Sequence, residues 1–258
     1  MGLFDGQVAA ITGASGGIGA HAARMFAREG AAVVIMARRG DRVRAVVEDI
    51  RAAGGRAEGF AGDAGSRADC EKLIQTAVDC FGGIDILMNN AGMPDFHLTA
   101  TIVDDDMWEE NIATHQSSAM YCCRAALPYM EKKGKGVIIN MASMSATTGN
   151  CGISSCATKA AIIGMTKNIG LEYTGTGIRC NAIAPGVVRQ EGLPGEPPPD
   201  PYKLTRNLSF FQKVQRHTDF TIEPSTIDEQ VDVIRFLASD ASRAITGQCI
   251  MTDKGISL

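Results

Sequence analysis

A glycine-rich segment near the start of the chain has the residue types and the spacing that bind a phosphate group. It follows the apolar run at residues 8–12 and precedes a segment of helical length, so the glycines lie at a strand-to-helix junction. Glycine lacks a Cβ atom, which permits a tight turn and lets backbone N–H groups and the positive helix end approach a pyrophosphate. We therefore expect a dinucleotide at this turn, bound by Gly13, Ser15, Gly16, Gly17, Ile18 and Gly19.

The end of the second apolar run indicates which dinucleotide is preferred. A carboxylate at this position would bind the adenine ribose, whereas an arginine would pair with an added 2′-phosphate. The residues there are Ala37, Arg38 and Arg39, with no acid among them. Because two guanidinium groups suit bidentate phosphate contacts, we expect NADP(H) to be favoured, with NAD(H) as the alternative.

Motifs spread over almost the whole chain resemble those of the classical short-chain dehydrogenases/reductases. They are Thr12-Gly13-x-x-x-Gly17-x-Gly19, Asn89-Asn90-Ala91-Gly92 and Pro185-Gly186. Residues 236–240 and 246–248 are also similar to the carboxyl-terminal part of that family. The resemblance implies further dinucleotide contacts, from Asp63, Ala64, Asn90, Lys159, Pro185, Gly186 and Val188.

The same resemblance implies hydride exchange between alcohols and carbonyl groups, with a catalytic set of Asn, Ser, Tyr and Lys. Ser143 matches the family serine and is expected to bind a substrate oxygen, with Ser145 as a nearby alternative. Lys159 matches the family lysine, which would contact the nicotinamide ribose and raise the local positive potential.

Two positions of the catalytic set depart from the family pattern. Four residues before Lys159, on the same helical face, the chain has Ser155 where the family has tyrosine. Serine is shorter and a much weaker acid, so it could act only through water or by leaving space for a larger substrate. His115 stands where the family has asparagine, and we expect it to provide or relay the proton, with a packing role as the alternative.

Other side chains offer no clear replacement for the missing phenol. Three of the four tyrosines fall in expected helices at packing positions and the fourth in a loop: Tyr121, Tyr129, Tyr173 and Tyr202. Gln190 and residues 252–255 also differ from the family pattern, without a readily interpreted effect. The eight cysteines lack the spacing of a zinc site, so we expect free thiols and no metal.

Short apolar runs rich in β-branched residues alternate with segments of helical length. The expected strands are residues 8–12, 32–37, 84–89, 136–142 and 178–183. The expected helices are residues 18–29, 42–53, 67–81, 106–131 and 155–173. Because the connections are too long for hairpins, the pattern predicts a Rossmann-type α/β fold, a doubly wound parallel sheet with helices on both faces. The family resemblance implies about seven strands.

A proline-rich segment at residues 192–201 interrupts this alternation. Proline lacks a backbone N–H group and fixes φ, which excludes a helix there. Long loops in compact domains are often active-site lids. We therefore expect one domain over residues 1–258 with a substrate lid at residues 190–224, and a tolerated surface insertion is the alternative.

Charge and hydropathy exclude several classes of partner. The formal net charge is −4 and the basic pairs are isolated, which argues against nucleic-acid binding. No apolar stretch is long enough to span a bilayer and the first residues lack the layout of a secretory signal, so we expect a cytoplasmic protein without a membrane partner.

Together these features predict an NADP(H)-dependent oxidoreductase that interconverts a ketone and a secondary alcohol. Met144, Phe210 and Phe211 indicate a fairly large apolar cyclic substrate, of the steroid, bile acid, flavonoid or isoflavonoid type. The resemblance implies a homo-oligomer, either a dimer or a tetramer. Two alternatives stay open: a catalytically silent dinucleotide-binding regulatory or scaffold subunit, and a non-redox lyase or isomerase on the same fold.

Overall fold

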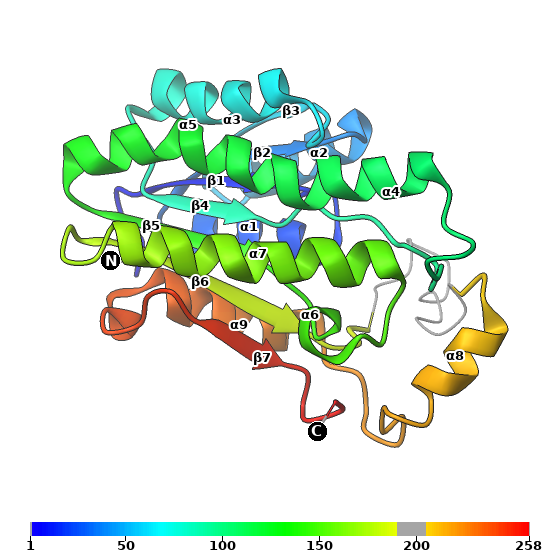
Figure 1. Ribbon diagram of the computed structural model, residues 1–258. Helices are drawn as coiled ribbons and strands as arrows, with labels where there is room; N and C mark the ends of the chain where they lie inside the picture. Colours follow the sequence, from blue (N-terminus) through cyan, green and yellow to red (C-terminus); the bar gives the residue numbers. More distant parts are fainter. Residues whose placement is uncertain (1, 190–204, 258) are drawn as a thin grey trace.

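A seven-stranded parallel sheet forms the centre of the computed structural model, which describes residues 2–189 and 205–257 (Figure 1). The strand order is β3-β2-β1-β4-β5-β6-β7, and every neighbouring pair is parallel. The strands are β1 (Val8–Thr12), β2 (Ala32–Ala37), β3 (Arg56–Ala61), β4 (Ile86–Asn89), β5 (Gly136–Met141), β6 (Ile178–Pro185) and β7 (Cys249–Thr252). The predicted doubly wound fold is confirmed.

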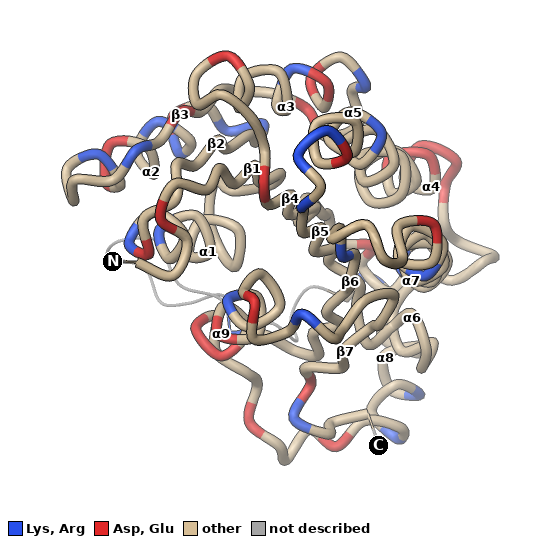
Figure 2. The backbone as a smooth tube through the Cα atoms, turned by 90° about the vertical axis from the view of Figure 1, so that its left-hand side faces the viewer, with Lys and Arg blue, Asp and Glu red and all other residues tan. Residues whose placement is uncertain are grey.

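Helices cover both faces of the sheet, as Figure 2 shows with the strands viewed nearly end-on. One face carries α1 (Gly17–Arg28), α2 (Gly40–Ala52) and α9 (Ile227–Ala238). The other face carries α3 (Arg67–Phe81), α5 (Ser118–Lys133) and α7 (Ile153–Glu172). Because helices cover the sheet on both sides, every residue of β1, β2 and β5 is buried, which explains why these strands are almost entirely apolar.

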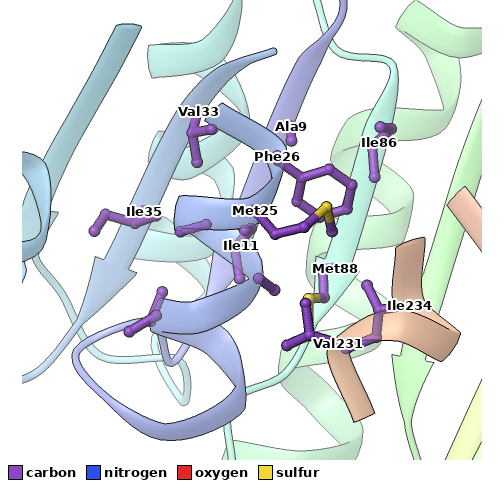
Figure 3. Close-up of a cluster of buried hydrophobic side chains, with 14 of the residues drawn as sticks. Ala9, Ile11, Met25, Phe26, Val33, Ile35, Ile86, Met88, Val231 and Ile234 are labelled. Carbon is purple, nitrogen blue, oxygen red and sulfur yellow. The ribbon is translucent and has the colours of Figure 1, made fainter. Parts of the chain in front are cut away.

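The core between the sheet and the first helical layer is built from aliphatic and aromatic side chains. Figure 3 shows Phe26 and Met25 of α1 against Ile11 and Ile86 of the sheet. Val231 and Ile234 of α9 complete the cluster from the side of β4. This packing fixes α1, and with it the glycine turn, against the carboxyl end of β1.

One expected helix differs from the structure in a way that matters for the site. Residues 106–131 were expected to be continuous, but α4 (Asp105–Asn111) is joined to α5 by a π-helical turn, η1 (Ile112–Ser117). A π-turn inserts an extra residue into the ladder and often occurs at functional positions. Sequence periodicity cannot locate it, because the apolar pattern continues on both sides.

Two strands were missed as apolar runs because they are the edges of the sheet. β3 and β7 each pair with one neighbour, and both are only partly buried. An edge strand needs no continuous apolar sequence, and β3 contains arginine, glutamate and glycine.

The carboxyl ends of the strands face the region where we expected the lid. Its described part, residues 205–224, contains α8 (Leu208–Val214), which lies beyond those strand ends in Figure 1. The side chain of Asn207 begins α8 by accepting the N–H of Phe210 at 3.2 Å. Gln190, the proline-rich residues 192–201 and Tyr202 lie outside the described residues, so the lid stays a prediction.

The short helices α6 (Ser145–Thr148) and η2 (Asp240–Ser242) complete the elements of the described chain. No helix in residues 2–189 or 205–257 is both long enough and apolar enough to cross a membrane. All eight cysteines are free thiols, as expected.

Candidate active site

A cavity of about 630 Å³ opens at the carboxyl ends of β1 and β4, where the strand order reverses. Open α/β sheets bind ligands at this switch point. The cavity brings together ten residues that the sequence predicted to bind a dinucleotide: Gly13, Ser15, Gly16, Ile18, Gly19, Arg38, Arg39, Asp63, Ala64 and Asn90.

The glycine turn has the backbone geometry of a pyrophosphate site. At Gly13 and Gly19 the backbone lies too close to neighbouring atoms for a side chain. Gly13 has φ +69°, and a Cβ atom there would lie 2.7 Å from Cα of Ala91. A Cβ atom at Gly19 would lie 2.4 Å from Nδ2 of Asn90. Gly16 is the N-cap residue before α1, and a Cβ atom there would lie 3.7 Å from an Arg39 nitrogen, so its outer side is open. The first amides of α1 are therefore exposed to an anion in the cavity.

Hydrogen bonds hold the loop after β4 against the glycine turn. Asn90 Nδ2 donates to the carbonyl oxygens of Thr12 and Gly13, at 2.9 and 3.1 Å. The hydroxyl of Thr12 accepts the backbone N–H groups of Asn90 and Ala91, both at 3.0 Å. The motif around Asn90 thus holds two walls of the cavity together, the glycine turn and the loop after β4.

The end of the cavity next to β2 is positively charged. Arg38 and Arg39 are exposed and line the cavity, and Arg39 Nη2 donates to the Ser15 hydroxyl at 3.1 Å. Asp63 lines the same cavity, where one carboxylate oxygen accepts the N–H of Gly65 at 2.9 Å.

Lys159 reaches the carboxyl end of β5, the strand that precedes Ser143. Lys159 Nζ, on α7, donates to the carbonyl oxygen of Met141 at 2.7 Å, two residues before Ser143. The Ser143 hydroxyl is partly buried and accepts the N–H of Ser145 at 3.2 Å. Burial lowers the pKa of Lys159 to about 8.

His115 occupies the π-turn η1 and is 3% exposed. Its Nε2 accepts the backbone N–H of Met93 at 3.0 Å, so the ring proton is on Nδ1. Nδ1 lies 2.9 Å from the hydroxyl of Thr158, which in turn donates to the carbonyl of Ser154 at 2.7 Å. Burial, followed by the charge of Lys159, lowers the pKa of His115 to about 2. Both ring nitrogens are used inside the protein, an arrangement that favours a positioning role over the predicted proton relay.

Ser155 lies in the first turn of α7, one helical turn before Lys159, and is partly buried. Its backbone N–H donates to a carboxylate oxygen of Asp95 at 3.0 Å. Among the described tyrosines, Tyr129 and Tyr173 bind Gln75 and Glu131 through their hydroxyl groups. None of the described tyrosines lines the dinucleotide cavity.

The predicted residues Gly17, Lys159, Pro185, Gly186 and Val188 are not in the cavity lining, and their cofactor contacts stay predictions. Pro185 ends β6 and accepts the N–H of Met144 at 2.9 Å. A Cβ atom on Gly186 would lie 2.6 Å from Cβ of Asp253, so residues 252–255 pack directly behind this turn. Val188 forms a bridge with Ser225.

Sequence reasoning missed several residues of the site. Thr114 lines the cavity because the π-turn brings it there, and a straight helix gave no reason to choose it. Asp95 and Thr158 hold the first turn of α7 and His115, contacts that join residues far apart in the chain. No signal in the sequence pairs them. Within the described ranges, no cluster of three or more His, Cys, Asp or Glu side chains could hold a metal.

Known proteins share both the sequence pattern and the fold. The family described as short chain dehydrogenase matches residues 7–194. The 3beta-hydroxysteroid dehydrogenase 2 of Eggerthella lenta is 34% identical over 257 residues, covering 99% of this chain and 96% of that protein. The 2,5-dichloro-2,5-cyclohexadiene-1,4-diol dehydrogenase LinX of Sphingobium indicum is 35% identical over 261 residues, covering 98% and 97%.

Two further relatives extend this likeness. The (2S)-[(R)-hydroxy(phenyl)methyl]succinyl-CoA dehydrogenase subunit BbsD of Thauera aromatica is 32% identical over 258 residues, covering 100% of this chain and 99% of that protein. A crystal structure of a Sinorhizobium meliloti 1021 protein assigned to the short-chain alcohol dehydrogenases is 30% identical, covers 98% of each chain and has a TM-score of 0.84. Sequence and fold agree over nearly the full length, and the chain belongs to the short-chain dehydrogenase/reductase family of enzymes.

Proposed function

We propose that this enzyme is an NADP(H)-dependent oxidoreductase that interconverts a ketone and a secondary alcohol on a fairly large apolar cyclic molecule. The observation that carries the proposal is the hydrogen bond from Lys159 to Met141 at the end of β5, two residues before Ser143 and on the strand that pairs with β4. A bound nicotinamide dinucleotide supplies or accepts the hydride. The side chains of the protein must then hold the substrate oxygen and orient the ribose.

We assign Ser143 to hold the substrate oxygen. Its Oγ already accepts the N–H of Ser145, and no described residue accepts the Ser143 hydroxyl proton. The hydroxyl can therefore donate that proton in a hydrogen bond to a carbonyl oxygen, which gains negative charge as hydride arrives at its carbon.

Lys159 and His115 have complementary roles in this proposal. One proton of the Lys159 ammonium group binds the carbonyl of Met141, which leaves two protons for ribose hydroxyls. His115 links the loop after β4, through Met93, to Thr158 on α7. We assign His115 as a positioning residue that fixes α7, whereas Ser155 leaves room for substrate or water where the family has a phenol.

The cofactor preference follows from the charges at the end of β2. Arg38 and Arg39 both line the cavity, and neither is paired with a carboxylate by any contact in the described chain. A 2′-phosphate would bind between them with charge-assisted hydrogen bonds. NAD(H) would leave both guanidinium groups without an anionic partner, so NADP(H) is the preferred cofactor.

The substrate class is inferred from the aromatic surroundings of α8 and from the relatives. Phe211 of α8 contacts the ring of His97, with ring centroids 5.2 Å apart, and the ring of Phe220 at 6.0 Å. Flat aromatic faces suit a cyclic apolar molecule. Relatives similar over almost their whole length are named for a steroid and for a cyclohexadiene-diol.

A groove between α5 and α7 supports the proposal of a homo-oligomer. It has a volume of about 340 Å³ and includes Met120, Leu127 and Met165. Met120 is 38% exposed on α5, and polar side chains that include Arg124 and Glu172 surround the apolar ones, as in surfaces that bind a second protein chain. Light scattering coupled to size exclusion should show a dimer or tetramer, and Met120→Glu should lower the mass, whereas a monomeric wild type contradicts the proposal.

Consumption of NADPH by the purified protein is the experiment that tests the proposed function. The substrate panel should contain steroid, flavonoid and small cyclic ketones, each assayed with NADPH and NADH by loss of reduced-nicotinamide absorbance. Turnover of one cyclic class supports the proposal. Product formed without added nicotinamide cofactor would instead indicate a non-redox lyase or isomerase.

A second function, that of a silent subunit, is favoured by the absence of a described tyrosine at the cavity. The relative BbsD is also named as a subunit of a dehydrogenase. A chain that binds dinucleotide without hydride transfer would then act as a silent regulatory or scaffold subunit. Tight NADPH binding, measured calorimetrically, with no consumption across the whole panel would favour this function over the first.

A further inference from the structure

A reaction between ketone and alcohol needs a proton donor, and the groups near Ser155 leave few candidates. His115 is neutral, with both ring nitrogens already hydrogen-bonded. Lys159 is turned toward the carbonyl of Met141. The hydroxyl of Ser155 is a far weaker acid than a phenol. None of these three groups is therefore a strong proton donor in this arrangement.

The loop at residues 95–98 is held directly against the turn that carries Ser155. The carboxylate of Asp95, 6% exposed, accepts the backbone N–H of Ser155 at 3.0 Å. The carbonyl of Leu98 accepts the N–H of Ile153 at 2.8 Å. At Gly152, a Cβ atom would lie 2.6 Å from the Asp95 carboxylate, so the loop and α7 approach as closely as backbone allows. Asp95 therefore holds the backbone of His97 close to the backbone of Ser155, the position where the family has the phenol.

The backbone of this loop is strained at His97. Phe96 and His97 have φ angles of 53° and 59°, and two consecutive non-glycine residues in the left-handed region are uncommon. Such strain persists only where surrounding contacts impose it, commonly at functional sites. Asp95 imposes it here, because its second carboxylate oxygen accepts the N–H of His97 at 3.2 Å.

A second contact holds the same strained loop from the side of α8. The Arg206 guanidinium lies 3.8 Å from the ring centroid of Phe96, and its backbone N–H donates to the Phe96 carbonyl at 2.9 Å. The loop is therefore clamped between α7 on one side and the segment leading into α8 on the other. A side chain held this firmly is pre-organised for binding.

The imidazole of His97 is the unsatisfied polar group of this clamp. Its Nδ1 is buried and has no hydrogen-bond partner. Nε2 has no hydrogen bond to any described residue either, and the ring edge packs against Phe211 of α8. An unpaired buried ring nitrogen is costly, so the site is completed when a ligand or water binds there. Burial lowers the pKa of His97, an effect that the carboxylate of Asp95 opposes.

We propose that His97 is the catalytic acid and base of this enzyme, in place of the phenol that is absent at position 155. In the reducing direction, hydride from the dinucleotide reaches the carbonyl carbon while the carbonyl oxygen takes the proton of the His97 imidazolium. The products are a secondary alcohol, neutral imidazole and oxidised dinucleotide. The oxidising direction reverses each transfer, and Asp95 acts as a positioning residue that fixes the His97 backbone. This inference rests on the proposed function.

Two variants at His97 keep its backbone conformation and remove its acid. Asparagine and glycine both tolerate positive φ, so His97→Asn and His97→Gly are expected to fold. His97→Asn should bind NADPH with the wild-type affinity and lose about 100-fold in kcat, the usual contribution of a general acid. His217, exposed in the same region, provides the matched control His217→Asn, which should retain full turnover.

Added imidazole separates a catalytic role from a structural one. His97→Gly leaves a space that free imidazole can occupy, so its addition should restore turnover in a concentration-dependent way and leave His97→Asn unchanged. An active wild type with an equally active His97→Asn, or with no rescue of His97→Gly, overturns the assignment to His97 and leaves the proposed function standing. A wild type that binds NADPH but consumes none overturns both.

Discussion

The Nζ atom of Lys159 donates a hydrogen bond of 2.7 Å to the carbonyl oxygen of Met141. This contact joins α7, which carries Lys159, to the end of β5. The accepting residue, Met141, lies two residues before Ser143. The hydrogen bond holds the Lys159 ammonium group at the strand end that leads to Ser143, and our proposal assigns both residues to the chemical part of the site.

The charge of Lys159 should set the alkaline limit of activity. Because burial lowers the pKa of Lys159 to about 8, the free enzyme loses this charge as the pH rises through that value. The pH profile of kcat/KM reports groups of the free enzyme, so kcat/KM should fall above about pH 8. Lys159→Arg stays protonated and should move this limb to higher pH, whereas an identical limb in both proteins would assign it to another group.

Ser143 should contribute more to turnover than its neighbour. Removal of one donor to a developing oxyanion typically costs about 100- to 1000-fold in kcat. We expect a loss in this range for Ser143→Ala and a smaller one for Ser145→Ala, whose hydroxyl is buried. Steady-state kinetics with the preferred ketone compares the two variants, and a larger loss at Ser145 would reverse the assignment.

His115 should make the protein less stable in mild acid. Its pKa is lowered from 6.5 to about 2 in the folded protein, so between these values the unfolded chain binds a proton that the folded chain does not. The free energy of unfolding therefore decreases as pH falls below about 6.5, by at most about 1.4 kcal/mol per pH unit from this group.

His115→Asn removes that titration and should make the dependence of stability on pH shallower. Denaturant unfolding at several pH values measures the slope, with the exposed variant His217→Asn as the control. A slope that is the same in His115→Asn and in the wild type would mean that His115 is not held neutral.

Arg39 should discriminate between the two nicotinamide cofactors. A charge-assisted hydrogen bond contributes about 1.5–3 kcal/mol, so Arg39→Ala should weaken NADPH binding about 10- to 100-fold and leave NADH binding nearly unchanged. Arg44, exposed on α2 and outside the cavity lining, provides the control Arg44→Ala. Titration calorimetry with both cofactors measures this, and equal losses for NADPH and NADH would argue against a 2′-phosphate site.

Strands buried on both faces were predictable from sequence, because burial requires an unbroken apolar run. β1 and β2 begin and end at the residues expected, and α3 does so as well. The edge strands β3 and β7 are only partly buried and need no unbroken apolar run, so the apolar pattern did not reveal them. The π-turn was also unpredictable, because one inserted residue changes hydrogen bonding without changing the hydrophobic pattern.

The dinucleotide cavity was predictable because its residues are adjacent in sequence and have a steric reason to be glycine. Gly13 and Gly19 show that reason directly in their contacts with Ala91 and Asn90. The contacts of Asp95 with Ser155 and of His115 with Thr158 link distant segments, which a single sequence does not reveal. The role expected for His115 depended on its free ring nitrogens, and only the fold shows that both are bound.

The most direct test is NADPH consumption by the purified wild-type enzyme across the panel of cyclic ketones, with calorimetric proof that the cofactor is bound. The proposed function predicts oxidation of NADPH with one class of cyclic ketone, faster than with NADH. If NADPH binds but none of the ketones in the panel causes its oxidation, this result would contradict the proposed function and favour the silent-subunit function.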